Sequence, residues 1–240
     1  LLGNGSNVLV RDKGIRGIVI KLGNMLRHFY EAEDLLVFGS GYSLALASYK
    51  AMECGKTGME FAVGIPGSIG GAVYMNAGAY DGEMQNIVNC VKVMDLQGNE
   101  RVLTAEELNF GYRKTSLQNS GLIVTEVTLK MPSGNKDEIK SKMDDFSHRR
   151  ISKQPLEMPS AGSMFKRPPG YFAGTLIDQA GLKGYTVGGA QISTKHAGFV
   201  VNVGGATAAD VLQLIKDVQT KIKAGVGVEL QPEVLVIGEE

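Results

Sequence analysis

The chain has 240 residues, of which 43% are apolar and 21% are charged, as is ordinary for a globular protein with a sizeable core. Lys plus Arg and Asp plus Glu each number 25, so there is no net charge to favour nucleic acid or an anionic membrane as partner. No apolar run approaches the ~20 residues of a membrane span. Two cysteines and three histidines without a ligand motif predict neither a metal site nor a disulfide framework, which suits the cytoplasm. Because the sequence opens on Leu1 rather than Met, we expect an N-terminal piece to be missing.

The first half of the chain predicts short strands separated by glycine turns. A helix is predicted over residues 43–54, with Gly55 as its C-terminal cap. The run Thr104-Ala105-Glu106-Glu107 has the pattern of a capping box and predicts one short helix. The strands are predicted over residues 7–10, 17–22, 35–38, 88–95, 101–103 and 122–131.

The pattern changes after Pro132. A charged helix is predicted over residues 135–152, then a loop-rich stretch over 154–171 and a clearly amphipathic helix over 207–224. Residues 233–237 predict a closing strand. Because strands and helices mix without strict alternation, the predicted fold class is α+β. We expect two domains, 1–131 and 132–240, with the last strand able to return to the first domain.

Glycine is the unusual feature of the composition. It makes up 32 of the 240 residues, or about 13%, where about 7% is average. In the run Gly3-Asn4-Gly5-Ser6-Asn7, consecutive N–H groups can form a concavity that suits phosphate, although a plain turn is the alternative. Val8 in the third glycine position argues against a Rossmann fingerprint. The backbone of residues 64–72 can approach a large flat ligand closely, although tight packing is the alternative. Two such segments suit the two ends of a dinucleotide, and NAD and FAD are both open at this point.

Three polar side chains are candidates for chemistry. Arg113 offers a planar fork for a carboxylate, and its alternative is a solvated surface arginine. Ser163 lies beside glycine and two cations, but it is not in a G-x-S-x-G elbow and no histidine lies at a suggestive distance, so a turn serine is the alternative. Glu233 stands at the start of an apolar strand, where it either has a partner or faces water.

In this order, these segments resemble the UDP-N-acetylenolpyruvoylglucosamine reductase (UDP-N-acetylmuramate dehydrogenase) family, whose FAD-binding fold is shared with vanillyl-alcohol oxidase. Only 49 residues lie between Arg113 and Ser163, which is typical of the shorter, type II branch without an extra tyrosine-bearing loop. The matching stretches are Gly3 to Val10, Gly64 to Gly71, Asn76 to Tyr80, Tyr112-Arg113, Ser152 to Pro155, Ala161 to Lys166 and Pro232 to Val234.

The resemblance implies an FAD-binding domain that lacks its N-terminal βαβ part here, plus a smaller α+β substrate-binding domain. It implies that NADPH reduces the bound FAD, and that hydride then passes from flavin N5 to a UDP-sugar, UDP-N-acetylglucosamine enolpyruvate. The product would be UDP-N-acetylmuramate, a cytoplasmic precursor of peptidoglycan. A flavin oxidase of the same fold and a non-catalytic nucleotide-binding protein are the rival interpretations.

The resemblance also implies roles for particular residues. Ser163 would donate the proton, and Arg113 and Glu233 would polarise the substrate carboxylate. The substrate-binding residues it implies are Lys153, Lys166 and Arg167. The cofactor-binding residues it implies are Gly3, Asn4, Gly5, Ser6, Asn7, Val8, Gly64, Ile65, Pro66, Gly67, Ser68, Gly70, Gly71, Asn76, Gly78 and Ala79.

Overall fold

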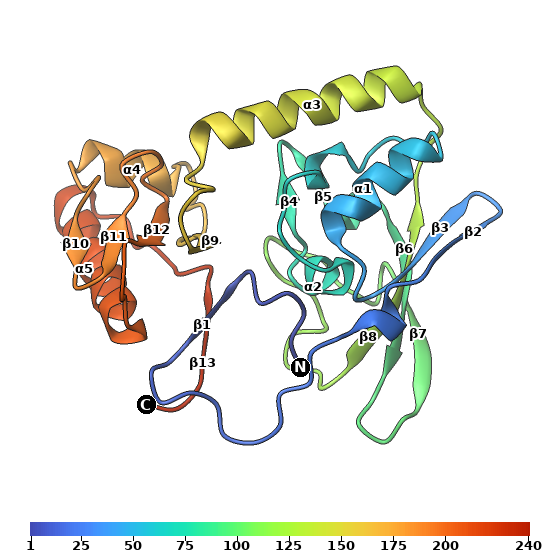
Figure 1. The fold of residues 1–240 in the computed structure, drawn as a ribbon, viewed down its shortest axis with the longest axis horizontal. Coiled ribbons are helices and arrows are strands. Elements are labelled where there is room, and N and C mark those ends of the chain that lie inside the picture. Colours follow the sequence, from blue (N-terminus) through green and yellow to red (C-terminus); the bar gives the residue numbers. More distant parts are fainter. The chain divides into compact units, whose positions relative to one another are not determined.

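A computed structural model describes all residues 1–240, which gather into two compact units (Figure 1). The first unit comprises Leu1–Gly5 and Val19–Arg150, and the second comprises Ser6–Ile18 and Ile151–Glu240. These units differ from the predicted domains, 1–131 and 132–240, in residues 6–18 and 132–150. The division into an FAD-binding domain, 1–131, and a substrate-binding domain, 132–240, stays a prediction.

The first unit is built on a five-stranded antiparallel sheet with the order β2-β3-β8-β6-β7. Helices α1 (Leu44–Glu53) and α2 (Ile69–Tyr74) share its hydrophobic core, which includes Phe38 and Val127 of the sheet. The strands are β2 (Phe29–Ala32), β3 (Leu35–Gly39), β6 (Val88–Met94), β7 (Glu100–Thr104) and β8 (Ile123–Lys130), and the short elements are β4 (Gly78–Ala79), β5 (Gly82–Glu83), η1 (Asn24–Leu26), η2 (Glu60–Ala62) and η3 (Met84–Asn86).

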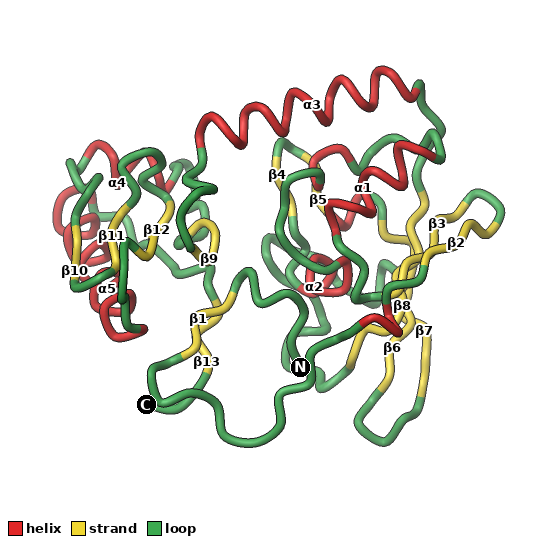
Figure 2. Tube along the Cα trace, in the orientation of Figure 1, coloured by secondary structure: helices red, strands yellow, loops and turns green.

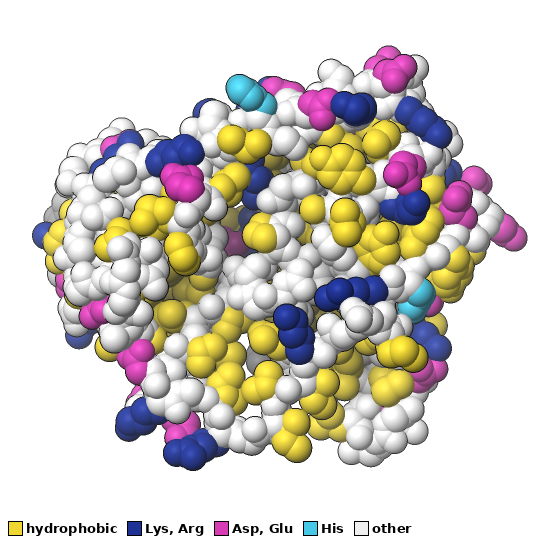
Figure 3. All heavy atoms as spheres, in the orientation of Figure 1, with side chains coloured by type: hydrophobic (Ala, Val, Ile, Leu, Met, Phe, Trp, Pro, Cys, Tyr) yellow, Lys and Arg dark blue, Asp and Glu magenta, His cyan; other side chains and the backbone are white.

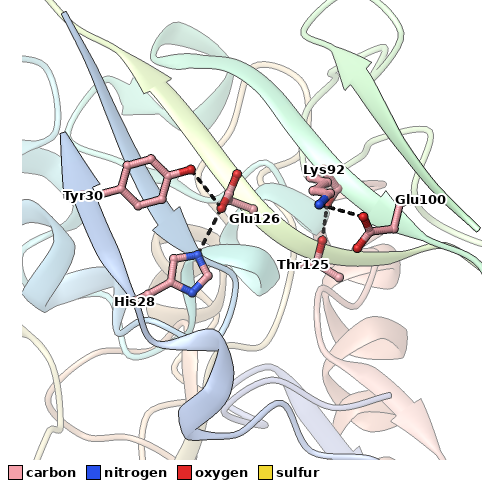
Figure 4. A network of polar contacts seen from close by, with 6 residues as sticks. All are labelled: His28, Tyr30, Lys92, Glu100, Thr125 and Glu126. Carbon is pink, nitrogen blue, oxygen red and sulfur yellow. Dashed lines mark hydrogen bonds and ion pairs between the residues drawn. The ribbon is translucent and has the colours of Figure 1, made fainter. Parts of the chain in front are cut away.

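The sheet also carries an exposed polar network (Figure 4). The Glu126 carboxylate lies 3.1 Å from Nε2 of His28 and accepts a 3.3 Å hydrogen bond from the Tyr30 hydroxyl. Lys92 pairs with Glu100 at 2.7 Å. Tyr30 belongs to β2 and Glu126 to β8, so their contact reaches across β3, which lies between these two strands.

Helix α3 (Lys136–Lys153) begins in the first unit. Its buried residues Ile139, Met143 and Phe146 form a small core with Val63, against which Tyr80 packs. This packing explains why residues 132–150 belong to the first compact unit.

The second unit combines a small sheet with two helices. The strand order of the sheet is β10-β11-β12-β9, and a separate parallel pair joins β1 to β13. The last strand therefore pairs with residues that the sequence assigned to the first domain. The elements are β1 (Val8–Val10), β9 (Ser160–Ser163), α4 (Ala173–Gln179), β10 (Thr186–Val187), β11 (Ala190–Ile192), β12 (Phe199–Asn202), α5 (Ala208–Val226) and β13 (Leu235–Ile237).

Two predicted elements are wrong. Residues 17–22 form no strand beyond a single bridge at Lys21 (Figure 2), and Ile18 is 91% exposed because no core covers it. The predicted capping box at Thr104 does form its two reciprocal hydrogen bonds with Glu107, at 2.8 and 3.3 Å. However, Thr104 ends strand β7 and the next residues form only a turn.

Helix α5 begins with a capping box formed by Thr207 and Asp210. The Thr207 hydroxyl accepts from the Asp210 amide at 3.1 Å, and the Asp210 carboxylate accepts from the Thr207 amide at 3.0 Å. The carboxylate of Asp12 accepts from the next two amides, of Ala208 and Ala209, at 2.7 and 2.9 Å. This helix start is therefore fully supplied with hydrogen-bond acceptors.

Replacing Thr207 by Ala is expected to lower the free energy of unfolding by ~1 kcal/mol, since the Asp210 amide loses its acceptor. Urea unfolding followed by circular dichroism measures the change. Thr220→Ala is the control in the same helix, because the Thr220 hydroxyl donates only to the Lys216 carbonyl, at 2.8 Å. Equal stability of the two variants would show that the cap contributes nothing.

Among the helices, none combines the length and the apolar character that crossing a bilayer requires. On the face of each unit seen in Figure 3, basic and acidic side chains are interspersed. An anionic ligand must therefore be bound by a local arrangement of groups.

Candidate active site

The glycine loop, residues 64–71, is held firmly in the first unit. The segment between β3 and α1 runs beside it and forms an isolated bridge from Ser43 to Ser68. Three backbone hydrogen bonds of 2.9 Å join the two, from Gly70 N to Ser40 O, from Ile69 N to Tyr42 O and from Leu44 N to Gly67 O. Ser68 also caps α2, because its hydroxyl accepts from the Gly71 amide at 3.3 Å. The loop is therefore preorganised.

Two glycines of the predicted cofactor set, Gly70 and Gly78, are required by packing, which was the alternative interpretation for residues 64–72. A Cβ on buried Gly70 would lie 2.7 Å from the Ser40 Cβ. A Cβ on Gly78 would lie 2.7 Å from the carbonyl oxygen of Gly82 in β5. At these two positions glycine is explained without any ligand.

Gly71, in contrast, leaves the backbone open towards a ligand. Gly71 is exposed, and a Cβ there would meet only the Ser68 hydroxyl, at 3.3 Å. A Cβ on Gly3 would lie 2.6 Å from the same hydroxyl. The two glycine-rich segments, about sixty residues apart in sequence, thus meet at Gly3 and Ser68. This side-chain-poor cradle fits a large flat cofactor.

The remaining predicted cofactor residues are distributed as follows. In the glycine loop, Pro66 is exposed and Ile65 and Gly67 are half-buried, and Ala79 lies in β4. The first glycine-rich segment spans both units: Asn4 and Gly5 belong to the first, and Ser6, Asn7 and Val8 to the second.

Arg113 lies in a tight turn of the first unit. Its backbone has φ +55°, a left-handed conformation that costs a non-glycine residue ~1–2 kcal/mol. The guanidinium donates to the carbonyls of Gly78 at 3.0 Å and Asn76 at 3.4 Å. The Asn76 side chain donates in turn to the Gly111 carbonyl, at 3.0 Å. Asn76 is fully buried, and its side chain supports the arginine turn.

Arg150 of α3 adjoins the glycine loop, although no motif in the sequence marks it as a site residue. A Cβ on Gly64 would lie 2.5 Å from its Cδ, so the arginine covers the start of the glycine loop. Burial lowers the pKa of its guanidinium, while Tyr80, whose ring lies 6.0 Å away, raises it. A partly buried cation therefore adjoins the glycine loop.

Ser163 and Glu233 lie on neighbouring segments of the second unit. Ser163 ends β9, and its hydroxyl donates to the Phe165 carbonyl at 3.4 Å. The chain continues to Met164, whose carbonyl accepts from the Glu233 amide at 2.8 Å. The side-chain amide of Asn7 donates to the Glu233 carbonyl at 3.2 Å. Asn7, a predicted cofactor-binding residue, is therefore hydrogen-bonded to Glu233, a predicted catalytic residue.

The predicted substrate-binding cations also belong to the second unit. Lys153 is exposed at the end of α3, and Lys166 is half-buried, with its amide donating to the Gln231 carbonyl at 2.8 Å. The guanidinium of Arg167 lies 3.9 Å from the centre of the Phe172 ring.

A histidine, His196, lies near the same glycine as the Ser163 hydroxyl, and no sequence motif indicates this. Strand β9 pairs with β12, which opposes Ser163 to Phe199. His196 precedes β12, and a Cβ on Gly198 would lie 3.0 Å from the His196 Cε1 and 3.6 Å from the Ser163 hydroxyl. Only strand pairing brings these residues together, so no sequence motif could have found them.

Comparison with known proteins defines the class of this protein. The FAD binding domain family matches residues 1–104, and the family described as UDP-N-acetylenolpyruvoylglucosamine reductase, C-terminal domain, matches residues 154–237. The cradle of Gly3 and Ser68 falls within the first match. The chain is therefore an FAD-dependent oxidoreductase, and the predicted two-domain α+β fold is confirmed.

Similarity over the whole chain defines the family. The UDP-N-acetylenolpyruvoylglucosamine reductases of Clostridium perfringens and Geobacillus thermodenitrificans are 52% and 51% identical to it, over 100% of this chain and 79% of each relative. The crystal structure of the reductase from Thermus caldophilus is 41% identical, with a TM-score of 0.86 over 98% of this chain and 84% of that one. The chain belongs to the UDP-N-acetylenolpyruvoylglucosamine reductase family, which confirms the resemblance.

Proposed function

We propose that this protein reduces UDP-N-acetylglucosamine enolpyruvate to UDP-N-acetylmuramate with NADPH, as a step of cytoplasmic peptidoglycan precursor synthesis. The observation that carries the proposal is the hydrogen-bonded pairing of the Ser163 segment with the Glu233 segment, which brings the backbones of these two residues into one small region. When bound, FAD would accept a hydride from NADPH and supply it to the methylene carbon of the enolpyruvyl group. The names of the relatives support this substrate.

The protein's own residues must make the double bond reactive. An enol ether accepts a hydride only if the charge that develops towards its carboxylate is stabilised. We assign that role to Arg113 and Glu233. The turn that holds Arg113 is fixed by Asn76 and Gly78, so little reorganisation is needed when substrate binds.

We assign to Ser163 the donation of the proton that completes the reduction. Hydride addition at the methylene carbon leaves the neighbouring carbon strongly basic, and the Ser163 hydroxyl donates its proton there. A hydroxyl is a weak acid at neutral pH, so this donor works only beside such a basic carbon. One hydride and one proton together saturate the double bond, and no other group leaves.

Diphosphate binding is assigned to Lys153, Lys166 and Arg167, which supply positive charge in the second unit. For the cofactor we keep the predicted glycine-rich residues, with Asn76 as a support for the arginine turn. On this proposal residues 1–131 bind FAD and residues 132–240 bind the UDP-sugar.

Product analysis tests the proposed reaction. The FAD-loaded protein is incubated with NADPH and the enolpyruvyl UDP-sugar, and the nucleotide sugars are separated and weighed by mass spectrometry. The proposal predicts a product heavier than the substrate by two hydrogens, which forms only when the protein, FAD and NADPH are all present. An unchanged UDP-sugar beside oxidised NADP⁺ would contradict it.

Two glycine variants separate cofactor contact from packing. Gly70→Ala is expected to lower the free energy of unfolding by about 1–3 kcal/mol, because its Cβ would collide with Ser40. Gly71→Ala is expected to keep or raise stability, since alanine favours a helix more than glycine does. It should nevertheless weaken FAD binding by about tenfold or more, the effect of an intruding methyl group.

Urea unfolding and titration of the apoprotein with FAD, followed by flavin fluorescence, measure both quantities. If Gly71→Ala bound FAD as tightly as the original protein, the open face of the glycine loop would not contact the cofactor.

A further inference from the structure

The loop before β12 holds His196 in one defined state. The His196 Nδ1 accepts a hydrogen bond from the Gly198 amide at 3.1 Å, and the ring packs edge-on against Phe199, with 5.0 Å between the ring centres. A ring nitrogen that accepts carries no proton, so the neutral ring is the Nε2–H tautomer. Burial lowers the pKa of His196, and the neighbouring Lys183 and Lys153 lower it further, while a hydrogen bond to its own backbone raises it.

The loop itself is rigid. The buried Ser193 accepts with its hydroxyl from the amides of Lys195 and His196, at 3.1 and 3.2 Å. The Phe199 amide donates to the His196 carbonyl at 3.0 Å. The imidazole therefore has a fixed place relative to β12.

This loop also holds the segment that carries Ser163. The Gly198 carbonyl accepts from the Met164 amide at 2.8 Å, next to the pairing of Phe199 with Ser163. Gly198 is thus bound on one side by the histidine ring and on the other by the residue after the serine. The Ser163 hydroxyl and the His196 Cε1 both lie within 4 Å of the point that a Cβ on Gly198 would occupy.

We propose that His196 is a positioning residue for the proton donor: its unprotonated Nδ1 anchors the Gly198 amide and thereby fixes the Ser163 hydroxyl. The inference rests on the proposed function, because it gives Ser163 the proton-donor role. A misplacement of ~1 Å in a reacting group can slow a reaction about 10²-fold, so an anchor of this kind matters for proton transfer.

The test compares three variants in the two half-reactions, followed by flavin absorbance without oxygen. His196→Ala removes the acceptor, and we expect flavin reoxidation by the enolpyruvyl substrate to slow by about tenfold or more, with flavin reduction by NADPH unchanged. His196→Asn places an amide oxygen near the position of Nδ1 and should restore most of the rate. His148→Ala removes an exposed histidine of α3 and should behave like the original protein.

Equal reoxidation in His196→Ala and the original protein would overturn the inference, as would equal slowing of both half-reactions or a failure of asparagine to rescue. Absence of substrate-dependent reoxidation in the original protein would instead overturn the proposed function, so the two failures are distinct.

A second measurement needs no variant and no activity. Nitrogen NMR of the protein labelled with ¹⁵N-histidine, assigned by comparison with His196→Asn, reports which ring nitrogen carries the proton. The inference predicts a neutral His196 with an unprotonated Nδ1 that is hydrogen-bonded to the Gly198 amide. A proton on Nδ1 of the neutral ring would overturn it.

Discussion

Ser163→Ala is expected to slow the reoxidation of reduced flavin by the enolpyruvyl substrate by roughly 10²-fold or more, while NADPH reduces the flavin at the original rate. The reason is that only the second half-reaction needs a proton from the hydroxyl. Loss of this hydroxyl also removes its 3.4 Å hydrogen bond to the Phe165 carbonyl, a weak contact that matters little for stability. Anaerobic stopped-flow absorbance measures the two half-reactions separately.

Ser160→Ala is the matched control, because Ser160 is an exposed serine at the other end of the same strand, β9. It should leave both half-reactions unchanged. If Ser163→Ala slowed both half-reactions equally, the serine would act on cofactor binding or folding, and its assignment as proton donor would fail.

Arg113→Lys should lower the rate of substrate reduction by about 10²–10³-fold, the typical loss when one group that stabilises developing charge is removed. Lysine keeps the positive charge, but it loses the planar fork that binds a carboxylate through two parallel hydrogen bonds. It also loses the paired contacts with the carbonyls of Gly78 and Asn76 that fix the side chain. Steady-state kinetics with saturating NADPH measures the effect.

Lys114→Gln is the control for Arg113→Lys, since Lys114 is the exposed neighbour in the same turn. Its removal changes the local charge without touching the fork. A rate close to the original in Arg113→Lys would mean that any cation suffices at this position, and that the arginine acts only by its charge.

The sequence predicted the long elements of the fold well and the short ones poorly. The amphipathic period of residues 207–224 is long enough to define α5, and the hairpin of β6 and β7 follows from its glycine turn. Helix α4 and strands β10 to β12 are seven residues or fewer, too short for a period to be visible. The strand predicted over residues 17–22 did not form because its apolar residues face no core.

The candidate site shows the same division between local and long-range information. Glycine-rich runs and the motif around Ser163 are local features, so they could be recognised. The support of Arg113 by Asn76, the cover of Gly64 by Arg150 and the anchoring of Gly198 by His196 depend on contacts between distant segments. Such contacts arise from strand pairing and helix packing, which a single sequence does not reveal.

An anaerobic double-mixing experiment distinguishes a reductase of the UDP-sugar from an oxidase. The FAD-loaded protein is first mixed with one equivalent of NADPH and then with the enolpyruvyl UDP-sugar, while the flavin absorbance near 450 nm is followed. For a reductase, we expect NADPH to bleach the flavin and the UDP-sugar to restore its colour in the absence of oxygen. A flavin that bleaches but recolours only when oxygen is admitted would contradict the proposed reduction and favour an oxidase.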